Sequence, residues 1–381
     1  MKYLEALLVT AIVALTASPT LAKTVKIGFP TCLSGPGAAY GINTSDGANM
    51  AVDEINEAGG INGNTLKMII TDGKCEPREA ALAAERLVTE DNVNVLLGGV
   101  ASSATLAVKA VAVRNKVPMV AGVAGADVLT QKGNKYIFRV VPDISMYTEF
   151  GVNYLCNVMK VKRVAFVFQN MALGRETVDL SKPRLEACGA TIVGSFPGSA
   201  QETNFQTTIT DLKAERPDVT FLIRWPSSAI AFLRQAAEAG FHSTWFNIGS
   251  LSGPDFTAQA GKFAEGLIGV NVFEPSTNRP LAKRFAEAFV KRYHHQPDWF
   301  AAGFYTAVKV IANAIRRGGT TRAGIAEALA KTKNLPTILG PITFDDKGQA
   351  SSLFTLFQYR NGQRKILREN VLVGQRYLPL K

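Results

Sequence analysis

Short apolar runs alternate along this chain with longer segments in which apolar residues recur at helical spacing. The first run covers residues 25–30, and in the next segment Ile42, Met50, Val52 and Ile55 recur roughly as on one face of a helix, which Gly59-Gly60 then ends. The same pattern predicts strands at 66–71, 93–99 and 118–122 and helices at 78–90 and 102–115. Strand and helix therefore alternate as in a doubly wound unit with a mainly parallel sheet.

The alternation restarts after residues 136–142, which we interpret as an extended crossover. The expected strands are 163–169, 191–196, 219–225 and 244–249, and the expected helices are 144–159, 174–188, 205–215 and 227–240. This second set predicts a second doubly wound unit.

The remainder of the chain follows a different pattern. An extended run is expected at 267–273, then helices at 281–294, 299–317 and 322–332, and short β runs near 342–344, 353–359 and 366–373. These helices are too many for the second unit alone, so we expect the chain to return to the first unit and cross between the two three times.

The expected fold class is therefore α/β, with two doubly wound parallel-sheet lobes joined by a three-segment hinge. Lobe 1 would comprise residues 23–141 plus 274–348, and lobe 2 would comprise residues 142–273 plus 349–381.

The first 22 residues differ from the rest of the chain. Lys2 precedes an apolar run over residues 6–17, and Ser18-Pro19 separates that run from a small residue, Ala22. The run is shorter than the roughly 20 residues that span a bilayer, which argues against a membrane anchor. We expect residues 1–22 to be a secretory signal, cleaved after Ala22.

The four cysteines could form disulfides. Cys32, Cys75, Cys156 and Cys188 all follow the signal, and export permits disulfides. Three pairings are possible. Only Cys32 with Cys75 and Cys156 with Cys188 joins cysteines of the same lobe, and it is equally possible that some of the cysteines are buried free thiols.

The net charge of +11 comes from scattered lysines and arginines without an interleaved aromatic stripe. We therefore expect no nucleic-acid partner and, as a secondary inference, an acidic ligand.

Candidate ligand contacts lie just after the predicted strands, where parallel sheets bind their ligands. Ser102 and Ser103 follow a Gly-Gly pair and open a helix, so backbone N–H groups and a hydroxyl could hold a carboxylate there. The alternative is that Ser102 only caps its own helix, and both interpretations stay open. Small residues over 121–126 add backbone donors.

Catalytic and cofactor motifs are absent from the sequence. Residues 33–38 lack the Walker lysine and a GxGxxG pattern, and the chain has no GxSxG, HExxH or metal-ligand spacing. Asp46 and Asp72 fall near the predicted mouth but are better explained as turn or cap residues. We therefore expect no enzyme activity and no cofactor.

Five segments resemble one family. Residues 26–36 (KIGFPTCLSGP), 59–63 (GGING), 72–77 (DGKCEP), 101–105 (ASSAT) and 340–345 (GPITFD) are similar to the leucine/isoleucine/valine-binding proteins, within the type I periplasmic binding-protein family. The resemblance implies a periplasmic protein whose lobes close on a small molecule. It also implies delivery to the permease and ATPase subunits of an ABC importer. Nothing in the sequence indicates an oligomer, so a monomer is expected.

The resemblance assigns roles in lobe 1. The family's carboxylate-holding serine corresponds to Ser102, and its backbone donors correspond to Val123 and Ala124. A family threonine that contacts the ligand's α-amino and carboxylate groups is replaced by Gly125. The carboxylate end of the family site is thus retained.

In lobe 2 the family's ligand residues are replaced. One cleft tyrosine corresponds to Leu173, another lies near Trp225, and the acidic partner of the ligand ammonium lies near Ser250. A buried ammonium without a carboxylate partner is strongly unfavourable, so an aromatic or hydrophobic acid is the favoured ligand. Arg224 is either a second polar anchor or a surface residue.

Three alternatives to this function remain. The first is a transporter-linked protein that binds leucine, isoleucine, valine or another hydrophobic amino acid. The second is a ligand-sensing, receptor-type regulatory module of the same fold, and the least favoured is a hydrolase. The family's disulfide also differs, because its partner position for Cys75 holds Ala101, and Cys32 on the adjacent strand end is the substitute.

Overall fold

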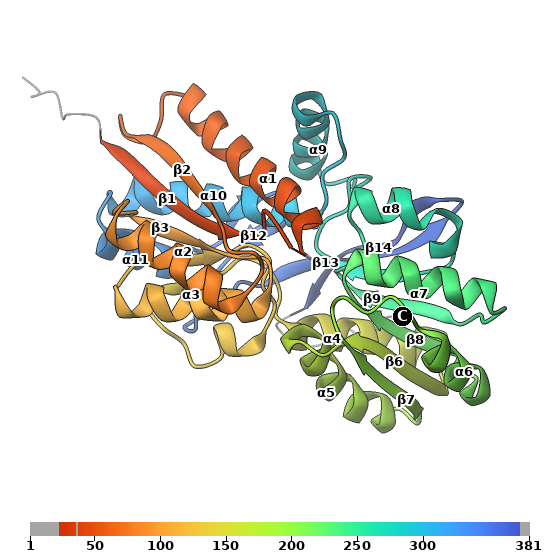
Figure 1. Cartoon of the computed structure of the whole chain (residues 1–381). Helices are drawn as coiled ribbons and strands as arrows, with labels where there is room; N and C mark the ends of the chain where they lie inside the picture. Colours follow the sequence, from red (N-terminus) through yellow and green to blue (C-terminus); the bar gives the residue numbers. More distant parts are fainter. Residues whose placement is uncertain (1–22, 36, 374–381) are drawn as a thin grey trace, which may run out of the picture.

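The structure is a computed structural model that describes residues 23–35 and 37–373. Two α/β lobes lie side by side, the first containing the start of the chain and the second containing β6 to β10 (Figure 1). The expected signal peptide, residues 1–22, and its cleavage after Ala22 lie outside the described residues. In the described part of the chain, no helix has both the length and the apolar character needed to cross a membrane.

The first sheet is parallel throughout and has the order β2-β1-β3-β4-β5. Its strands are β1 (Thr24–Thr31), β2 (Thr65–Asp72), β3 (Val95–Gly98), β4 (Met119–Ala121) and β5 (Ile137–Arg139). Strand β5 lies within the segment that we expected to be only a crossover. It is short and ends on a charged residue, Arg139, which the structure nevertheless buries completely.

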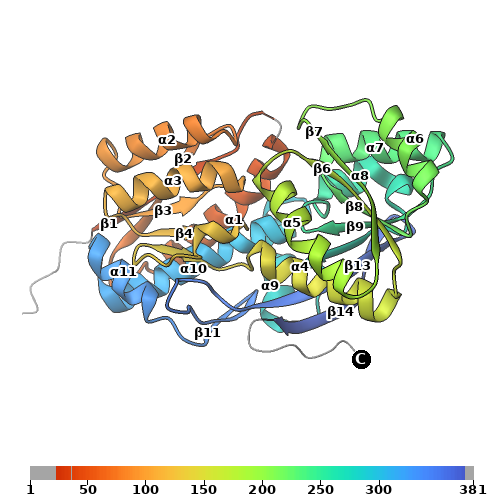
Figure 2. The same ribbon diagram turned by 90° about the horizontal axis from the view of Figure 1, so that it is seen from below.

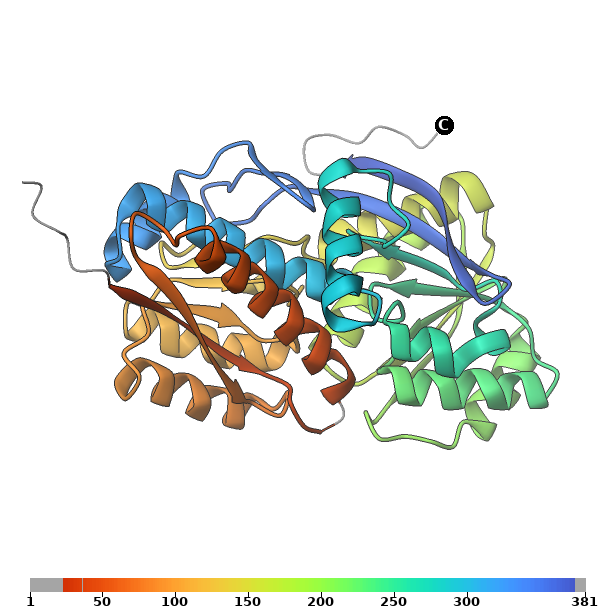
Figure 3. The same cartoon turned by 90° about the horizontal axis from the view of Figure 1, so that it is seen from above.

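Helices cover both faces of this sheet. Helices α2 (Pro77–Thr89) and α3 (Ser102–Arg114) lie on one face, and α1 (Ala38–Glu57) and α10 (Trp299–Gly318) lie on the other (Figure 2). Helices α1 and α10 run side by side, and α11 (Arg322–Ala330) packs on α10 (Figure 3). Helix α10 begins where the Asp298 carboxylate accepts a hydrogen bond from Ala301 N at 2.9 Å. The C-terminal part of the chain therefore contributes α10 and α11 to the first lobe.

The second sheet has the order β14-β13-β10-β9-β8-β6-β7. Its parallel strands are β6 (Arg163–Gln169), β7 (Thr191–Gly198), β8 (Val219–Ile223), β9 (Thr244–Ile248) and β10 (Ile268–Asn271). Two antiparallel strands, β13 (Ser352–Arg360) and β14 (Gln363–Val373), extend one edge. They are joined by Asn361-Gly362, whose φ angles of 53° and 69° suit the tight turn of a hairpin.

The side chains of β6 show why this sheet needs helices on both faces. Val164, Phe166 and Phe168 belong to one buried cluster, whereas Ala165 and Val167 belong to another, as the alternation of a strand requires. The first cluster includes residues of α4 (Ile144–Asn153) and α5 (Ala172–Ala187). The second includes residues of α6 (Gln206–Glu215), α7 (Pro226–Glu238) and α8 (Pro254–Ala260).

The remaining elements are short or peripheral. A π-helical segment, Tyr154–Met159, continues α4, and 3-10 turns lie at Asp127–Leu129 and Gly261–Ala264. Helix α9 (Pro280–Tyr293) follows β10, and β11 (Leu335–Thr337) pairs with β12 (Gly340–Ile342) in a two-stranded sheet. We propose the lobe boundaries expected above, with crossovers near residues 141, 273 and 348.

Candidate ligand-binding site

A cavity lies where strand ends of the two sheets face each other. It contains about 810 Å³ of space outside protein atoms, including its open mouth. Eight of the nine ligand contacts expected from the sequence line it: Ser102, Ser103, Val123, Gly125, Leu173, Arg224, Trp225 and Ser250. The ninth, Ala124, is buried but does not line the cavity.

Ser102 is buried at the first turn of α3. The residue that caps α3 is Ala101, so the interpretation of Ser102 as the cap of its own helix is wrong. Its Oγ instead accepts a hydrogen bond from Ala126 N at 3.2 Å. The hydroxyl proton is then available to donate to a group in the cavity.

Backbone donors gather around Ser102. The first hydrogen bond of α3 runs from Thr105 N to Ala101 O, so the N–H groups of Ser102 and Ser103 precede the helical ladder. The N–H groups of residues 123–125 donate to none of the described residues. This end of the cavity is therefore rich in donors and lies at the positive end of a helix, which suits an anion.

Gly125 occupies a confined position in this turn. Its carbonyl accepts from Ile144 N at 2.9 Å, at the start of α4. A Cβ at Gly125 would lie 3.3 Å from Ile144 Cγ1, so a larger residue would press on α4.

A buried arginine that the sequence did not single out supports the same turn. Arg139 donates through Nη1 to Ala126 O at 2.7 Å and to Ala124 O at 3.3 Å, and through Nη2 to Thr130 Oγ1 at 2.8 Å. Burial lowers the pKa of Arg139, while Asp143, 3.6 Å from Nη2, favours its charged form. Arg139 thus fixes the turn from behind without lining the cavity.

The interpretation of Arg224 as a surface residue is wrong. It is buried rather than on the surface, and its guanidinium serves protein partners. Nη2 donates to Ser199 O at 2.7 Å and to Glu202 Oε2 at 2.8 Å, and Nε donates to Ser228 Oγ at 2.8 Å. Burial lowers the pKa of Arg224, against the attraction of Glu202. Arg224 therefore holds the β7–α6 loop against α7 while it also lines the cavity.

Protein donors occupy the acceptors at the lobe 2 end of the cavity. Trp299 Nε1 donates to Gly249 O, Tyr40 Oη donates to Ser250 O at 2.8 Å, and Asn247 Nδ2 donates to Ser250 Oγ at 2.9 Å. The lining residues that the structure describes include no aspartate or glutamate. A cationic group placed at this end would find no carboxylate; among the lining side chains, Tyr147 Oη is buried without a hydrogen-bond partner.

Aromatic rings form much of the wall. Tyr40 stacks on Phe300 with ring centroids 4.3 Å apart, and Trp225 lies 5.3 Å from Tyr40. Trp299 contacts Phe300 at 4.4 Å. Of these rings the sequence indicated only Trp225. The others lie on α1 and α10, where their apolar positions are indistinguishable from ordinary core residues.

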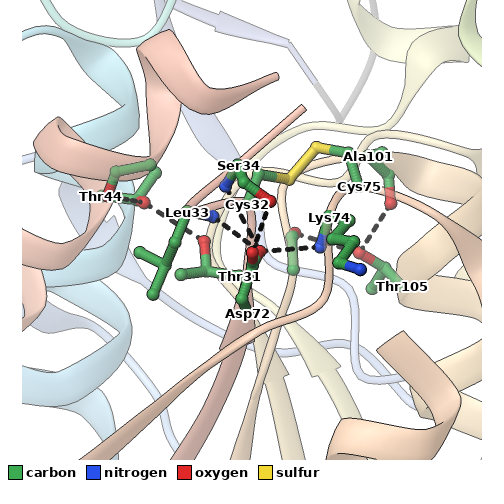
Figure 4. The surroundings of a disulfide bond; sticks show 12 residues. Thr31, Cys32, Leu33, Ser34, Thr44, Asp72, Lys74, Cys75, Ala101 and Thr105 are labelled. Atoms are coloured by element: carbon green, nitrogen blue, oxygen red, sulfur yellow. Dashed lines mark hydrogen bonds between the residues drawn. A yellow bond between two sulfur atoms is a disulfide. The ribbon is translucent and has the colours of Figure 1, made fainter. Parts of the chain in front are cut away.

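A disulfide fixes the loop at the cavity's edge (Figure 4). Cys32 and Cys75 are joined, and nearby the Asp72 carboxylate accepts from Leu33 N at 3.0 Å, Lys74 N at 2.9 Å and Ser34 Oγ at 2.5 Å. Burial would raise the pKa of Asp72, but these hydrogen bonds lower it below its usual value. Asp72 is therefore a turn residue. Asp46 is neither a turn nor a cap residue, because it lies within α1 and pairs with His295 Nε2 at 3.0 Å.

The Cys32–Cys75 disulfide is linked to the cavity through Gly37. A Cβ at Gly37 would lie within 2.4 Å of Cys75 Sγ and 3.2 Å of Trp225, so the loop packs tightly against lobe 2. The second disulfide joins Cys156 and Cys188, away from the cavity, and no cysteine is free. These are the two pairs, expected above, in which both cysteines belong to the same lobe. Within the described residues, no cluster of histidine, cysteine or acidic side chains could hold a metal ion.

Two α/β lobes around a donor-lined cavity define a ligand-binding protein of the type I periplasmic fold, as expected from the sequence. The chain belongs to the family described as periplasmic binding protein, whose model matches residues 24–364.

A curated relative covers nearly the whole chain. The Leu/Ile/Val-binding protein BraC3 of Rhizobium johnstonii is 30% identical over 363 residues, which are 94% of this chain and 98% of the relative. The resemblance noted in the sequence is thereby confirmed.

Solved structures give the same fold. The branched-chain amino acid transporter substrate binding protein LivJ of Streptococcus pneumoniae, in complex with isoleucine, is 29% identical with a TM-score of 0.85, over 92% of this chain and 99% of that one. A solute binding protein of an ABC transporter from R. palustris, in complex with benzoate, is 20% identical with a TM-score of 0.86, over 94% and 99% of the two chains. The second likeness shows the fold alone.

Proposed function

We propose that this chain is the solute-binding protein of an ABC importer and that its cavity binds a small carboxylate without an ammonium group. The family consists of binding proteins rather than enzymes, and LivJ is named as part of a transporter. The partners would be the permease and ATPase subunits of the importer. The protein would act as a periplasmic monomer after cleavage behind Ala22.

The observation that carries this proposal is the unequal distribution of donors and acceptors in the cavity. At the lobe 1 end, the Ser102 hydroxyl and the N–H groups of residues 123–125 are free to donate. At the lobe 2 end, the carbonyls of Gly249 and Ser250 already accept from protein donors. A carboxylate gains charge-assisted hydrogen bonds at the lobe 1 end, whereas the described lining offers an ammonium no aspartate or glutamate to pair with.

The aromatic wall supports a ring or a branched apolar group as the rest of the ligand. Tyr40, Trp225, Trp299 and Phe300 present flat apolar surface on which a ring can pack. An α-amino acid would place its charged ammonium close to the carboxylate and lose the water around it. An aromatic or hydrophobic acid avoids that desolvation cost.

Docking would proceed in two steps. The ligand carboxylate first binds the donors of lobe 1, and lobe 2 then closes, bringing Trp225 and Leu173 onto the apolar part. The large surface that lobe 2 contributes explains why closure would be needed for tight binding.

Binding of a hydrophobic amino acid is the second candidate. It is favoured by one observation, the sequence identity with a Leu/Ile/Val-binding protein and with a LivJ crystallised with isoleucine. Because the fold accommodates both ligand classes, the choice rests on the polar groups of the cavity.

A thermal-shift screen of the purified mature protein tests the proposal. Ligands that bind the native state raise the unfolding midpoint by mass action. Ring carboxylates such as benzoate should stabilise the protein, whereas leucine and valine should not. Stabilisation by the branched-chain amino acids alone would replace the proposed ligand class with the second candidate.

A further inference from the structure

Trp299 has an unusual position among the rings of the cavity. It is the first residue of α10, directly after the helix cap Asp298, and it is almost fully buried. Its ring contacts Phe300 at 4.4 Å and meets Tyr147 edge-on at 6.1 Å. Helix α10 packs on α1 and β4, so Trp299 belongs to the first lobe while lining the shared cavity.

The indole of Trp299 reaches a backbone carbonyl of the second lobe. Nε1 donates to the oxygen of Gly249, which follows β9. Gly249 has a φ of 74°, a conformation that glycine adopts readily, and a Cβ there would lie 3.2 Å from Trp299 Cζ2. A glycine at this position therefore lets the ring lie against the backbone and satisfy its carbonyl.

Ser250, the residue after Gly249, also accepts hydrogen bonds from protein donors. Ser250 O accepts from Tyr40 Oη, another first-lobe side chain, and Ser250 Oγ accepts from Asn247. Gly249 O accepts from Trp299 Nε1 and from Ser252 Oγ at 3.2 Å, so both of its lone pairs are used, and the next carbonyl, Ser250 O, accepts from Tyr40 Oη. An ammonium that approached Gly249 O would have to displace one of its two donors and leave a buried indole N–H or the Ser252 hydroxyl without that partner.

We infer that Trp299 is a specificity-determining residue that excludes ligands carrying an ammonium group. By donating to Gly249 O, its indole removes an acceptor that such a ligand needs, and its ring supplies apolar surface in the same place. Tyr40 has the same effect at Ser250 O, because its hydroxyl donates a hydrogen bond to that oxygen. This inference rests on the proposed function, since it explains how the cavity selects acids without an amine.

Matched ligand pairs isolate the effect of the ammonium. 3-Phenylpropanoate and L-phenylalanine differ only in the α-ammonium group, and so do 4-methylpentanoate and L-leucine. For each pair, calorimetry gives the ratio of the Kd of the amino acid to the Kd of its acid. The ratio is measured for the wild-type protein, Trp299→Phe, Tyr40→Phe and Trp245→Phe.

The variants are chosen to separate polarity from packing. Trp299→Phe keeps an aromatic ring but removes one of the two donors to Gly249 O, the other being Ser252 Oγ, and Tyr40→Phe removes the donor to Ser250 O. Trp245→Phe is the matched control, because Trp245 is a buried tryptophan of β9 that does not line the cavity. Circular dichroism establishes that each variant is folded, and Tyr40→Phe provides the test should Trp299→Phe not fold.

The expected result is a high ratio for the wild type that falls about tenfold or more in Trp299→Phe, because a charged hydrogen bond becomes available to the ammonium. Tyr40→Phe should also lower the Kd ratio, and Trp245→Phe should leave the ratio unchanged. An unchanged ratio in folded Trp299→Phe and Tyr40→Phe would overturn the inference while leaving the proposed function intact. A wild-type preference for the amino acids would overturn the proposed ligand class itself.

Discussion

Gln349 accepts a hydrogen bond from Nε of Arg139 at 2.6 Å, and its own amide donates to Val141 O at 2.8 Å. Both side chains are buried, and they join two of the segments through which the chain passes between the lobes. Arg139 also holds the carbonyls of Ala124 and Ala126. The turn that offers donors to the ligand is therefore connected directly to the crossover region.

Gln349→Leu should lower the free energy of unfolding by about 1 to 3 kcal/mol, because it leaves a buried guanidinium N–H without its acceptor. Urea denaturation measures this change. Gln131→Leu, at an exposed position in the same lobe, is the control and should change stability by no more than about 0.5 kcal/mol. Equal effects of the two substitutions would show that the Arg139–Gln349 contact contributes nothing measurable.

Ser102→Ala should weaken ligand binding by about 1 to 3 kcal/mol, roughly 5- to 150-fold in Kd, because the carboxylate loses a hydroxyl donor. Ser195→Ala, at an exposed position on β7, is the control and should leave the Kd unchanged. Titration calorimetry with the best ligand of the screen provides both values. If Ser102→Ala binds every ligand as the wild type does, the docking model for lobe 1 is wrong.

Both disulfides should stabilise the fold, but only one of them should affect ligand binding. They close loops of 43 and 32 residues in sequence separation, so replacing either pair by serine should cost about 2 to 4 kcal/mol of stability. Only the loss of Cys32–Cys75 should also weaken binding, because its loop packs on Trp225 through Gly37. Equal losses of affinity in both double variants would contradict this assignment.

Asp298 should make stability depend on pH. Burial raises its pKa to about 6, against hydrogen bonds from Ala301 and Asn43 that lower it. An unfolded aspartate has a pKa of about 3.9, so the protonated carboxyl favours the fold below about pH 4 and this contribution is lost as the pH rises through about 6.

Asp298→Asn cannot ionise and retains a good helix cap. Relative to the wild type, its free energy of unfolding should rise by about 2 kcal/mol between pH 4 and pH 7, measured by urea denaturation. Asp211→Asn, at an exposed position on α6, controls for the change in net charge. A difference between Asp298→Asn and wild type that stays constant with pH would contradict the prediction.

Much of the fold follows from local pattern. The alternation in β6 and the glycine pair after α1 depend only on neighbouring residues, and the sequence predicted both elements. The segment 136–142 was expected to be extended, but its pairing as strand β5 was not predicted, and the charge of Arg139 in it is buried against distant partners such as Gln349. The β runs expected at 353–359 and 366–373 correspond to β13 and β14, but their antiparallel pairing was not predicted, although Asn361-Gly362 is a strong hairpin signal.

The site was predictable to the extent that it follows strand ends. Ser102 and residues 123–125 were found because ligands bind beyond the carboxyl ends of parallel strands. Trp299 and Tyr40 were not, because helix faces that meet the cavity are set by packing between segments far apart in the sequence. The role of Arg224 was missed for the same reason, since Ser199 and Glu202 reach it from another loop.

The central claim is that the cavity binds a carboxylate and rejects an ammonium. Titration of the purified mature protein with benzoate and, separately, with L-leucine tests it most directly. The account predicts one benzoate bound per chain and no measurable heat of binding for leucine. Saturable one-to-one binding of leucine, with none for benzoate, would contradict it.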